Sequence, residues 1–409
     1  MSSEQDFRIA VLGGGAAGFF AAIRCKEMHP HADVVLVEAT GKLLSKVKVS
    51  GGGRCNVTTA APDRQFLLQG YPRGSRQLKG LFHRFDNDDA MDWFESKGVE
   101  LYTQEDGRVF PISDNSQTIV DLLIDQAREC GVQIKSRTRV SALEQSGSSS
   151  WTLQTGSTPI IADKVIICTG GSPKRSGLEW LETLGHDIVD PVPSLFTFNM
   201  PGNPITELTG LSVPSAMVSL IGTKLHSSGP LLITHWGMSG PAILKMSALA
   251  ARELADMEYT FEIRIRWCGD KPEEHLRSVI TETMRSSGGK QMYSCTPFEI
   301  PKRLWSFLLG KCDFRSDHHW SDLGKKGINK LVDMLMNDTY NVQGKTTFKE
   351  EFVTCGGISL QSVNMKTMES KTAPGIYFAG EVLDIDGITG GYNFQAAWTT
   401  AYVAGELAS

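Results

Sequence analysis

The sequence of 409 residues lacks a run of apolar residues long enough to span a bilayer, and it lacks a C-x-x-C pair. Its eight cysteines are scattered, and only Cys312, with His318 and His319 nearby, resembles part of a metal site. No second cysteine lies close to that group. We therefore expect no disulfide scaffold and no bound metal. The segment before residue 7 is polar and acidic, so we expect no signal peptide, no membrane association and a cytoplasmic location.

The chain also lacks a large excess of one charge. Its 41 Lys and Arg residues stand against 46 Asp and Glu, a net charge of −5, which gives no overall attraction to nucleic acid or to an anionic membrane. Hydrophobic residues make up 41% and charged residues 21%, as is typical of a globular protein. At this length we expect two or three domains.

Glycine is abundant, and its first cluster lies in the stretch that organises the chain. Residues 8–12 are predicted to form a strand and residues 19–28 a helix, and the G-x-G-x-x-G pattern lies between them. In that pattern Gly13 makes the turn, Gly15 lets the backbone approach a pyrophosphate, and Gly18 allows close packing of helix on strand. The phosphates would lie at the helix N-terminus, where unpaired N–H groups favour negative charge.

A second predicted strand, residues 33–38, completes this unit and ends in Glu38. Glu38 lies at the distance from the glycines that a ribose-binding carboxylate needs. A 2′-phosphate would meet like charge there, so the unit favours FAD or NAD over NADP.

A second glycine-rich segment follows, over residues 41–58, and is predicted to be a loop. Lys46, Arg54 and Asn56 in this segment can donate hydrogen bonds to a phosphate or to the edge of a heterocycle. A flexible surface loop is the alternative. Residues 42–84 are strongly basic, which fits either an anionic substrate or a solvated surface. The basic residues of this stretch, set against the single acid Asp63, are Lys42, Lys46, Lys48, Arg54, Arg64, Arg73, Arg76, Lys79 and Arg84.

The remaining glycine clusters lie beside two predicted strands, at 164–168 and within 375–384. The first strand runs into Thr-Gly-Gly. The second ends in glycine and an acid and is followed by a glycine-rich turn over 386–393 and an apolar helix over 394–407. Such a turn could hold a pyrophosphate, a ribityl chain or a flavin oxygen on its N–H groups. Between the two regions, prolines interrupt short apolar runs after residue 190, and residues 272–336 are mostly helical, so an insertion divides the nucleotide-binding domain.

These stretches together resemble a known family. The carrying segments are residues 13–18, 50–58, 234–244, 356–358 and 380–395. They resemble the bacterial flavoproteins labelled NAD(P)/FAD-dependent oxidoreductase or aminoacetone oxidase-like, whose FAD domain is similar to that of two-dinucleotide-binding-domain flavoproteins. The resemblance implies an α/β fold in which a Rossmann-like FAD-binding domain carries inserted β-barrel-like and helical domains.

The expected domains follow from this resemblance and from the shifts in composition. We expect a discontinuous FAD-binding domain (1–192 and 354–409), a β-barrel-like domain (193–270 and 338–353) and a helical domain (271–337). The pattern and the resemblance together predict the following cofactor-binding residues: Gly13, Gly15, Ala16, Ala17, Gly18, Glu38, Lys46, Gly53, Arg54, Cys55, Asn56, Val140, Thr169, Gly170, Gly171, Gly380, Glu381, Asp384, Gly390, Gly391 and Asn393. Val140 enters only through the resemblance, as part of the strand that meets the adenine.

Activities assigned within the family are reduction of an enone in bile-acid precursors, oxidation of an aminoketone, and reduction of uridine in ribosomal RNA to dihydrouridine. Our leading hypothesis is FAD-dependent reduction of an activated C=C bond, with Cys55 or His235 as the catalytic acid. The substrate would be ribosomal RNA, with Arg73, Arg76 and Lys79 as candidate phosphate contacts, or a small molecule. The alternatives are a flavin oxidase of a small aminoketone and a redox or partner-binding flavoprotein without turnover. The chain carries only one complete dinucleotide fingerprint, so NAD(P)H would bind transiently or be replaced by another reductant. The oligomeric state stays open.

Overall fold

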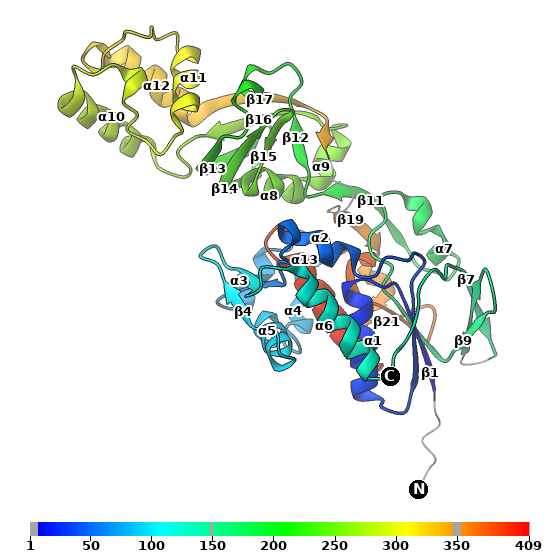
Figure 1. Ribbon diagram of the computed structural model, residues 1–409. Coiled ribbons are helices and arrows are strands. Elements are labelled where there is room, and N and C mark those ends of the chain that lie inside the picture. Colours follow the sequence, from blue (N-terminus) through cyan, green and yellow to red (C-terminus); the bar gives the residue numbers. More distant parts are fainter. Residues whose placement is uncertain (1–6, 148–149, 347–352, 409) are drawn as a thin grey trace. The chain divides into compact units, whose positions relative to one another are not determined.

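The computed structural model describes residues 7–147, 150–346 and 353–408 (Figure 1). The chain forms two compact units, one made of Met1–Ser194 with Lys349–Ser409 and the other of Leu195–Phe348. The second unit is therefore a single insertion into the first. The segments predicted as β-barrel-like and helical, 193–270 and 271–337, lie almost entirely in this insertion. Residues 347–352 of the predicted segment 338–353 lie outside the described residues.

The first unit contains a seven-stranded sheet in the order β20-β21-β22-β10-β1-β2-β6. The five strands from β22 to β6 pair in parallel, so their carboxyl ends share one edge of the sheet. The bounds are β1 Arg8–Leu12, β2 Asp33–Val37, β6 Gln133–Lys135, β10 Lys164–Ile167, β20 Val363–Asn364, β21 Glu369–Ser370 and β22 Ile376–Phe378. Strands β1 and β10 are apolar and almost wholly buried, as expected for a parallel sheet covered on both faces.

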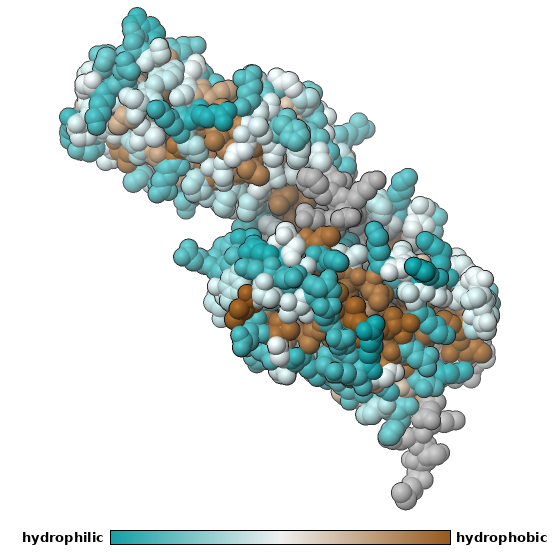
Figure 2. All heavy atoms as spheres, in the orientation of Figure 1, coloured by the Kyte–Doolittle hydropathy of each residue, from teal (hydrophilic) through white to brown (hydrophobic). Residues whose placement is uncertain are grey.

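Two helices from opposite ends of the chain pack together on this sheet, α1 (Ala16–Met28) and α13 (Tyr392–Gly405). Both are largely buried, and Phe20 of α1 packs against Trp398 of α13. Some hydrophobic residues beside this core stay partly exposed, and Figure 2 shows hydrophobic residues at the surface around α1 and α6. This packing fixes the N-termini of both helices near the carboxyl edge of the sheet.

The rest of the first unit consists of short helices and three small sheets. The helices are α2 Ser45–Gly53, α3 Arg64–Gln69, α4 Ser75–Leu81, α5 Asn87–Ser96, α6 Ser116–Glu129 and α7 Glu179–Glu182. The sheets are β3-β5-β4 (Thr58–Thr59, Arg108–Pro111, Leu101–Thr103), β7-β8-β9 (Val140–Ser146, Ser150–Thr155, Ile160–Ala162) and β11-β19 (Ile188–Ser194, Val353–Ile358). The prediction of a loop over 41–58 is wrong in its first part, because Ser45 begins a helical turn that buries Val47 in the core.

The second unit is built on a seven-stranded antiparallel sheet, in the order β17-β16-β13-β14-β15-β12-β18. Its strands are β12 Thr197–Asn199, β13 Ser212–Leu220, β14 His226–Thr234, β15 Gly237–Ser239, β16 Thr260–Arg266, β17 Asp338–Gln343 and β18 Lys345–Thr346. Its helices are α8 Pro241–Leu249, α9 Ala251–Asp256, α10 Glu273–Ser287, α11 Lys302–Lys311 and α12 Lys325–Asn337. One hydrophobic core runs from the sheet into α10, α11 and α12, so strands and helices form one packed body.

Candidate functional site

The turn between β1 and α1 has the geometry that a bound dinucleotide requires. Gly13 has φ of +112°, and a Cβ on it would lie 2.2 Å from the carbonyl oxygen of Cys168. A Cβ on Gly18 would lie 1.8 Å from the carbonyl oxygen of Gly13, so the helix packs directly on the turn. A Cβ on Gly15 would meet nothing within 4 Å, which leaves the backbone open to a ligand at the helix N-terminus.

Glu38 is held against this turn. One carboxylate oxygen of Glu38 accepts a hydrogen bond from the backbone N–H of Gly14 at 2.8 Å, and the other accepts from the backbone and hydroxyl of Thr40. Each carboxylate oxygen has lone pairs to spare, so the side chain can also accept from a ribose hydroxyl. The backbone of Thr138 donates to the carbonyl of Glu38, which brings Val140, at the start of β7, close to the same place.

Segments that follow β10 and β22 also meet at this edge. Cys168 donates its backbone N–H to Leu12, so Thr169 and Gly170 continue beside the glycine turn. A Cβ on Gly171 would lie 2.7 Å from a carboxylate oxygen of Glu381, and a Cβ on Gly380 would lie equally close to the Cβ of Ala17. The predicted residues after the two strands therefore pack against one another and against the first turn of α1, which also contains Ala16.

Lys46 joins α2 to this group. Its ammonium lies 2.6 Å from a carboxylate oxygen of Glu381, although 335 residues separate the two in sequence. Leu44, just before the helix, donates its backbone N–H to Gly14. Helix α2 thus connects the dinucleotide turn with the segment after β22. Lys46 and Glu381, each predicted as a cofactor-binding residue, form an ion pair with one another.

At its C-terminal end α2 leaves helical geometry. Gly51, Gly52 and Gly53 all have positive φ, and a Cβ on Gly52 or Gly53 would meet nothing within 4 Å. Arg54 stacks over the ring of Phe110 at 4.1 Å and lies 3.7 Å from a carboxylate oxygen of Asp114. Gly52 and Gly53 therefore leave the backbone of the loop open on one side, whereas Gly51 packs against Phe110 and Arg54 lies over the same ring on the β5 side of the loop.

Two predicted residues that follow the loop are buried. Cys55 is 0% exposed, and burial raises the pKa of its thiol to about 12. Such a thiol keeps its proton and is closed to solvent, which argues against the predicted role of Cys55 as the catalytic acid. Asn56 is 8% exposed, and its Oδ1 has no hydrogen-bond partner among the described residues.

The C-terminal loop that leads into α13 is held rigidly. Asn393 accepts a hydrogen bond from the backbone N–H of Gly387 and donates one to its carbonyl. Gly390 and Gly391 have φ of +119° and +95°, and a Cβ on Gly391 would lie 2.3 Å from the backbone of Thr58. Asn393 therefore fixes the turn by its side chain. Asp384 precedes this turn and is half-buried.

His235 belongs to the second unit. It lies in the turn between β14 and β15, its side chain is exposed, and its ring contacts that of Trp236 edge to face at 4.1 Å. An exposed imidazole can exchange protons with solvent and with a substrate.

Comparison with known proteins agrees with this geometry. Residues 7–407 match the family described as HI0933-like protein Rossmann domain. The chain belongs to the HI0933-like family. The predicted family resemblance and the α/β class with a Rossmann-type domain are thereby confirmed.

Two curated members are similar over nearly their whole length. A 3-dehydro-bile acid delta(4,6)-reductase of Clostridium scindens is 27% identical over 98% of this chain and 99% of its own. A ribosomal RNA dihydrouridine synthase of Haemophilus influenzae is 28% identical over 96% of each chain. Among solved structures, a 3-ketosteroid-delta4-(5alpha)-dehydrogenase of Rhodococcus jostii aligns with a TM-score of 0.51, at 13% identity, over 100% of this chain and 97% of its own, and shows the same fold. The prediction that this HI0933-like chain is an enzyme is confirmed.

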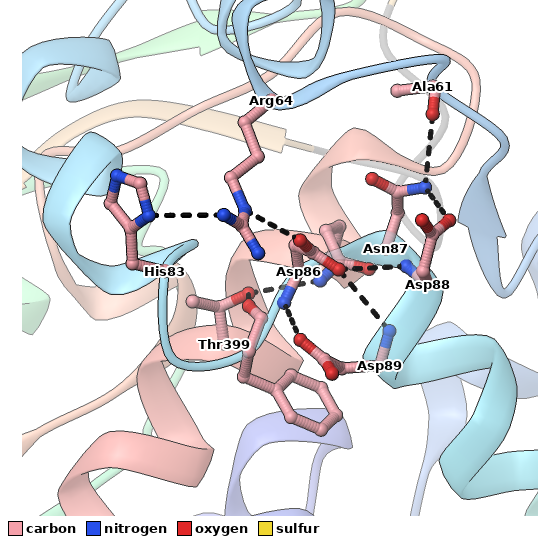
Figure 3. Close-up of polar contacts among 10 residues, drawn as sticks. Ala61, Arg64, His83, Asp86, Asn87, Asp88, Asp89 and Thr399 are labelled. Atoms are coloured by element: carbon pink, nitrogen blue, oxygen red, sulfur yellow. Dashed lines mark hydrogen bonds and ion pairs between the residues drawn. The ribbon is translucent and has the colours of Figure 1, made fainter.

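In the folded HI0933-like chain, much of the positive charge of the basic stretch at 42–84 is paired with acidic residues. Five of its nine bases form ion pairs with acids elsewhere in the first unit: Lys46 with Glu381, Arg54 with Asp114, Arg64 with Asp86, Arg73 with Asp386, and Arg84 with Glu406. Figure 3 shows Arg64 between Asp86, which caps α5, and His83. Arg73 is thus committed to a carboxylate, which argues against its predicted role as a phosphate contact.

Two further observations concern the described residues only. Over residues 7–147, 150–346 and 353–408, no helix has both the length and the apolar character needed to cross a membrane. In the same parts of the chain, His, Cys, Asp and Glu side chains form no group of three or more that could hold a metal ion.

The residues of the first unit fit FAD. The open backbone at Gly15 suits a pyrophosphate, and Glu38 beside the turn suits a ribose. Two buried polar atoms near the loop and the strand ends, Asn56 Oδ1 and Thr354 Oγ1, have no hydrogen-bond partner among the described residues, and a polar ligand could supply one. Thr354 was not predicted from the sequence as a site residue, because a threonine in a short apolar strand is ordinarily a packing residue.

Proposed function

We propose that this chain is an FAD-dependent oxidoreductase that reduces an activated C=C bond. The open glycine turn at Gly15, with Glu38 beside it, carries the assignment of the dinucleotide cofactor. The names of the two curated relatives, a delta(4,6)-reductase and a dihydrouridine synthase, support the reaction class. Both describe saturation of a ring C=C bond, and that shared chemistry is what we assign to this chain.

Bound FAD supplies the two-electron hydride chemistry. The chain's own residues bind and orient it. The N-terminus of α1 accommodates the phosphates at Gly15, Glu38 accepts from the ribose, and the Lys46–Glu381 pair lies where the segments after β10 and β22 meet. Thr169, Gly170, Gly171, Gly53, Arg54, Asn56, Asp384, Gly390 and Gly391 complete the set that we assign to cofactor binding.

Reduction of the C=C bond also needs a proton at the carbon that does not receive hydride. We assign this role to His235 in preference to Cys55, since His235 is exposed and Cys55 is 0% exposed. NAD(P)H is the reductant that we propose, as a transient visitor, because the sequence contains one complete dinucleotide fingerprint and that one is used by FAD.

We propose uridine in ribosomal RNA as the substrate, with a small enone as the second candidate. Lys42, Lys48, Arg76 and Lys79 support RNA: each is exposed and forms no ion pair within the described residues. Cations of this kind bind phosphates, and their contribution weakens as salt rises. The small enone is supported by the name of the bile-acid relative.

The test is reoxidation of the photoreduced holoenzyme, prepared without oxygen, by unmodified ribosomal RNA, a steroid enone or oxygen, each offered in a separate mixture. Reoxidation by RNA, with dihydrouridine in the product, supports RNA reduction. Reoxidation by the enone alone supports the second candidate. Reoxidation by oxygen alone contradicts the proposal. In a separate experiment the oxidised holoenzyme is mixed with the aminoketone; rapid flavin reduction, followed by peroxide formation once oxygen is admitted, would indicate an oxidase. For RNA, replacing Lys42, Lys48, Arg76 and Lys79 by Ala should lower the slope of log affinity against log salt by up to about 3.

A further inference from the structure

Thr354 carries a buried hydroxyl without a partner. It lies on β19, opposite Pro193 of β11, and is 0% exposed. Its Oγ1 has no hydrogen-bond partner among the described residues. Leaving a buried hydroxyl unsatisfied destabilises a fold, so such groups are rare in a folded chain unless something else binds them.

The surroundings of this hydroxyl are the segments assigned to the cofactor. A Cβ on Gly171 would lie 2.3 Å from Thr354 Oγ1 and 2.7 Å from a carboxylate oxygen of Glu381. The backbone N–H of Thr354 donates to that same oxygen at 2.9 Å. The other oxygen of Glu381 pairs with Lys46. Thr354 is therefore tied to Glu381 through its backbone, while its hydroxyl lies against the bare backbone of Gly171.

The Thr354 hydroxyl is held in a fixed place with no side chain of Gly171 over it. The backbone of Thr354 is fixed by Glu381, and Gly171 carries no side chain that would cover the hydroxyl. A hydroxyl can rotate to donate or to accept, so it can serve a ligand atom of either kind. If burial alone were required at this position, valine would fill the same volume without a polar atom to satisfy.

We propose that the Thr354 hydroxyl binds a polar atom of FAD, as a cofactor-binding residue beyond those assigned above. The inference rests on the proposed function, since it needs FAD in the first unit. It makes Gly171 the residue whose missing side chain leaves the hydroxyl uncovered by a Cβ, which would lie 2.3 Å from it. It also gives the Lys46–Glu381 pair a second task, which is to position Thr354 through its backbone.

The experiment compares variants that differ by the hydroxyl alone. Thr354→Val is set against the wild type, and Thr354→Ala against Thr354→Ser, because each pair is matched in shape apart from one oxygen. Tyr377→Phe is the control: Tyr377 is 0% exposed and its hydroxyl also has no partner in the part of the chain that the structure describes, but it lies within β22. For each full-length protein, FAD release on dilution is followed by flavin fluorescence, and thermal unfolding is measured across an FAD titration.

We expect Thr354→Val to bind FAD about tenfold more weakly than the wild type, and Thr354→Ala about tenfold more weakly than Thr354→Ser. Without added FAD, Thr354→Val should unfold at the wild-type temperature or above, since an unsatisfied hydroxyl has been removed. As FAD is added, Thr354→Val should gain less thermal stability than the wild type, so the two titration curves are not parallel. Tyr377→Phe should bind FAD like the wild type.

Two results would overturn the inference. One is equal FAD affinity within both matched pairs; the other is a set of parallel titration curves, which would indicate a structural role, for instance through a bound water. If Thr354→Val fails to fold, the Ala and Ser pair still decides the matter. Absence of FAD binding by the wild type would contradict the proposed function itself, and is thereby distinguished from failure of this inference.

Discussion

Arg73 and Asp386 form a buried ion pair between residues 313 positions apart. Arg73 Nε lies 2.6 Å from one carboxylate oxygen of Asp386, and Arg73 Nη2 pairs with the other. Asp386 is 0% exposed, and Ser194 Oγ also donates to it at 3.0 Å. The pair links the segment between α3 and α4 to the loop that opens α13 and to the end of β11.

Removing Arg73 should therefore damage the fold more than it affects RNA binding. Arg73→Met leaves an uncompensated buried carboxylate and should destabilise the chain by about 3 kcal/mol or more. Burial already raises the pKa of Asp386, and Arg73 opposes that shift. Because a raised folded-state pKa favours the protonated form, the deficit of Arg73→Met should shrink as the pH falls from 7 to 5. Urea unfolding at both pH values measures this.

A matched control is Arg277→Met, which removes a partly exposed pair with Glu273. It should cost no more than about 1 kcal/mol and show little dependence on pH over the same range. Equal costs for the two variants would contradict the view that Arg73 is a structural residue.

Alanine at Gly15 and at Gly18 should affect two different properties, FAD affinity and stability. Gly18→Ala places a Cβ 1.8 Å from the carbonyl oxygen of Gly13, so it should lower the free energy of unfolding by about 2 kcal/mol or more. Gly15→Ala meets no protein atom within 4 Å and should leave that free energy nearly unchanged. It should instead weaken FAD binding, because the methyl group occupies the open side of the turn. Urea unfolding without added FAD and FAD titration separate the two effects; unimpaired FAD binding by Gly15→Ala would count against phosphate binding at this turn.

Much of the nucleotide-binding fold is visible in the sequence. The predicted strand 8–12 coincides with β1, and the predicted strand 33–38 differs from β2 by one residue. These elements follow from apolar runs bounded by glycine or by an acid, which are local signals. Helix α1 begins at Ala16, three residues before the predicted start, because Gly15 is already its N-cap.

What the sequence could not show depends on contacts across the chain. Helices α3 and α4 are six and seven residues long, too short for a clear periodicity. The basic bias at 42–84 suggested a free cationic surface, yet its partners, among them Glu381 and Asp386, lie some 300 residues away in sequence. Thr354 was missed for the same reason, since only the fold brings it against Gly171 and Glu381.

Asp163 should make stability depend on pH in the acid range. Arg8 donates three hydrogen bonds to it, one from its backbone at 2.8 Å and two from its guanidinium, and these side-chain bonds lower the pKa of Asp163. A carboxyl with a lowered folded-state pKa stabilises the fold above its unfolded pKa, near 3.9, and that contribution is lost as the pH falls through the folded value.

Asp163→Asn should therefore cost about 1 kcal/mol at pH 7, and the difference from the wild type should fall toward zero below about pH 3. Urea unfolding of both proteins from pH 7 down to the acid transition provides the comparison. A difference that stays constant with pH would show that the ionised carboxylate is not the stabilising form.

Cys55 and His235 should respond differently to substitution if His235 supplies the proton. Cys55→Ala keeps a side chain at a residue whose φ is +62°, so backbone strain stays the same, and the buried thiol has a pKa raised to about 12 by burial. The rate of substrate reduction should remain within about threefold of the wild type, with an unchanged pH profile. His235→Gln should lower that rate by about a hundredfold or more and remove any pH dependence that a histidine imposes. Stopped-flow reoxidation of the reduced holoenzyme, from pH 5.5 to 9, measures both. A large loss of the reduction rate in Cys55→Ala, with normal FAD content, would indicate that Cys55 supplies the proton. A packing role alone would not slow the chemical step while the cofactor stays bound.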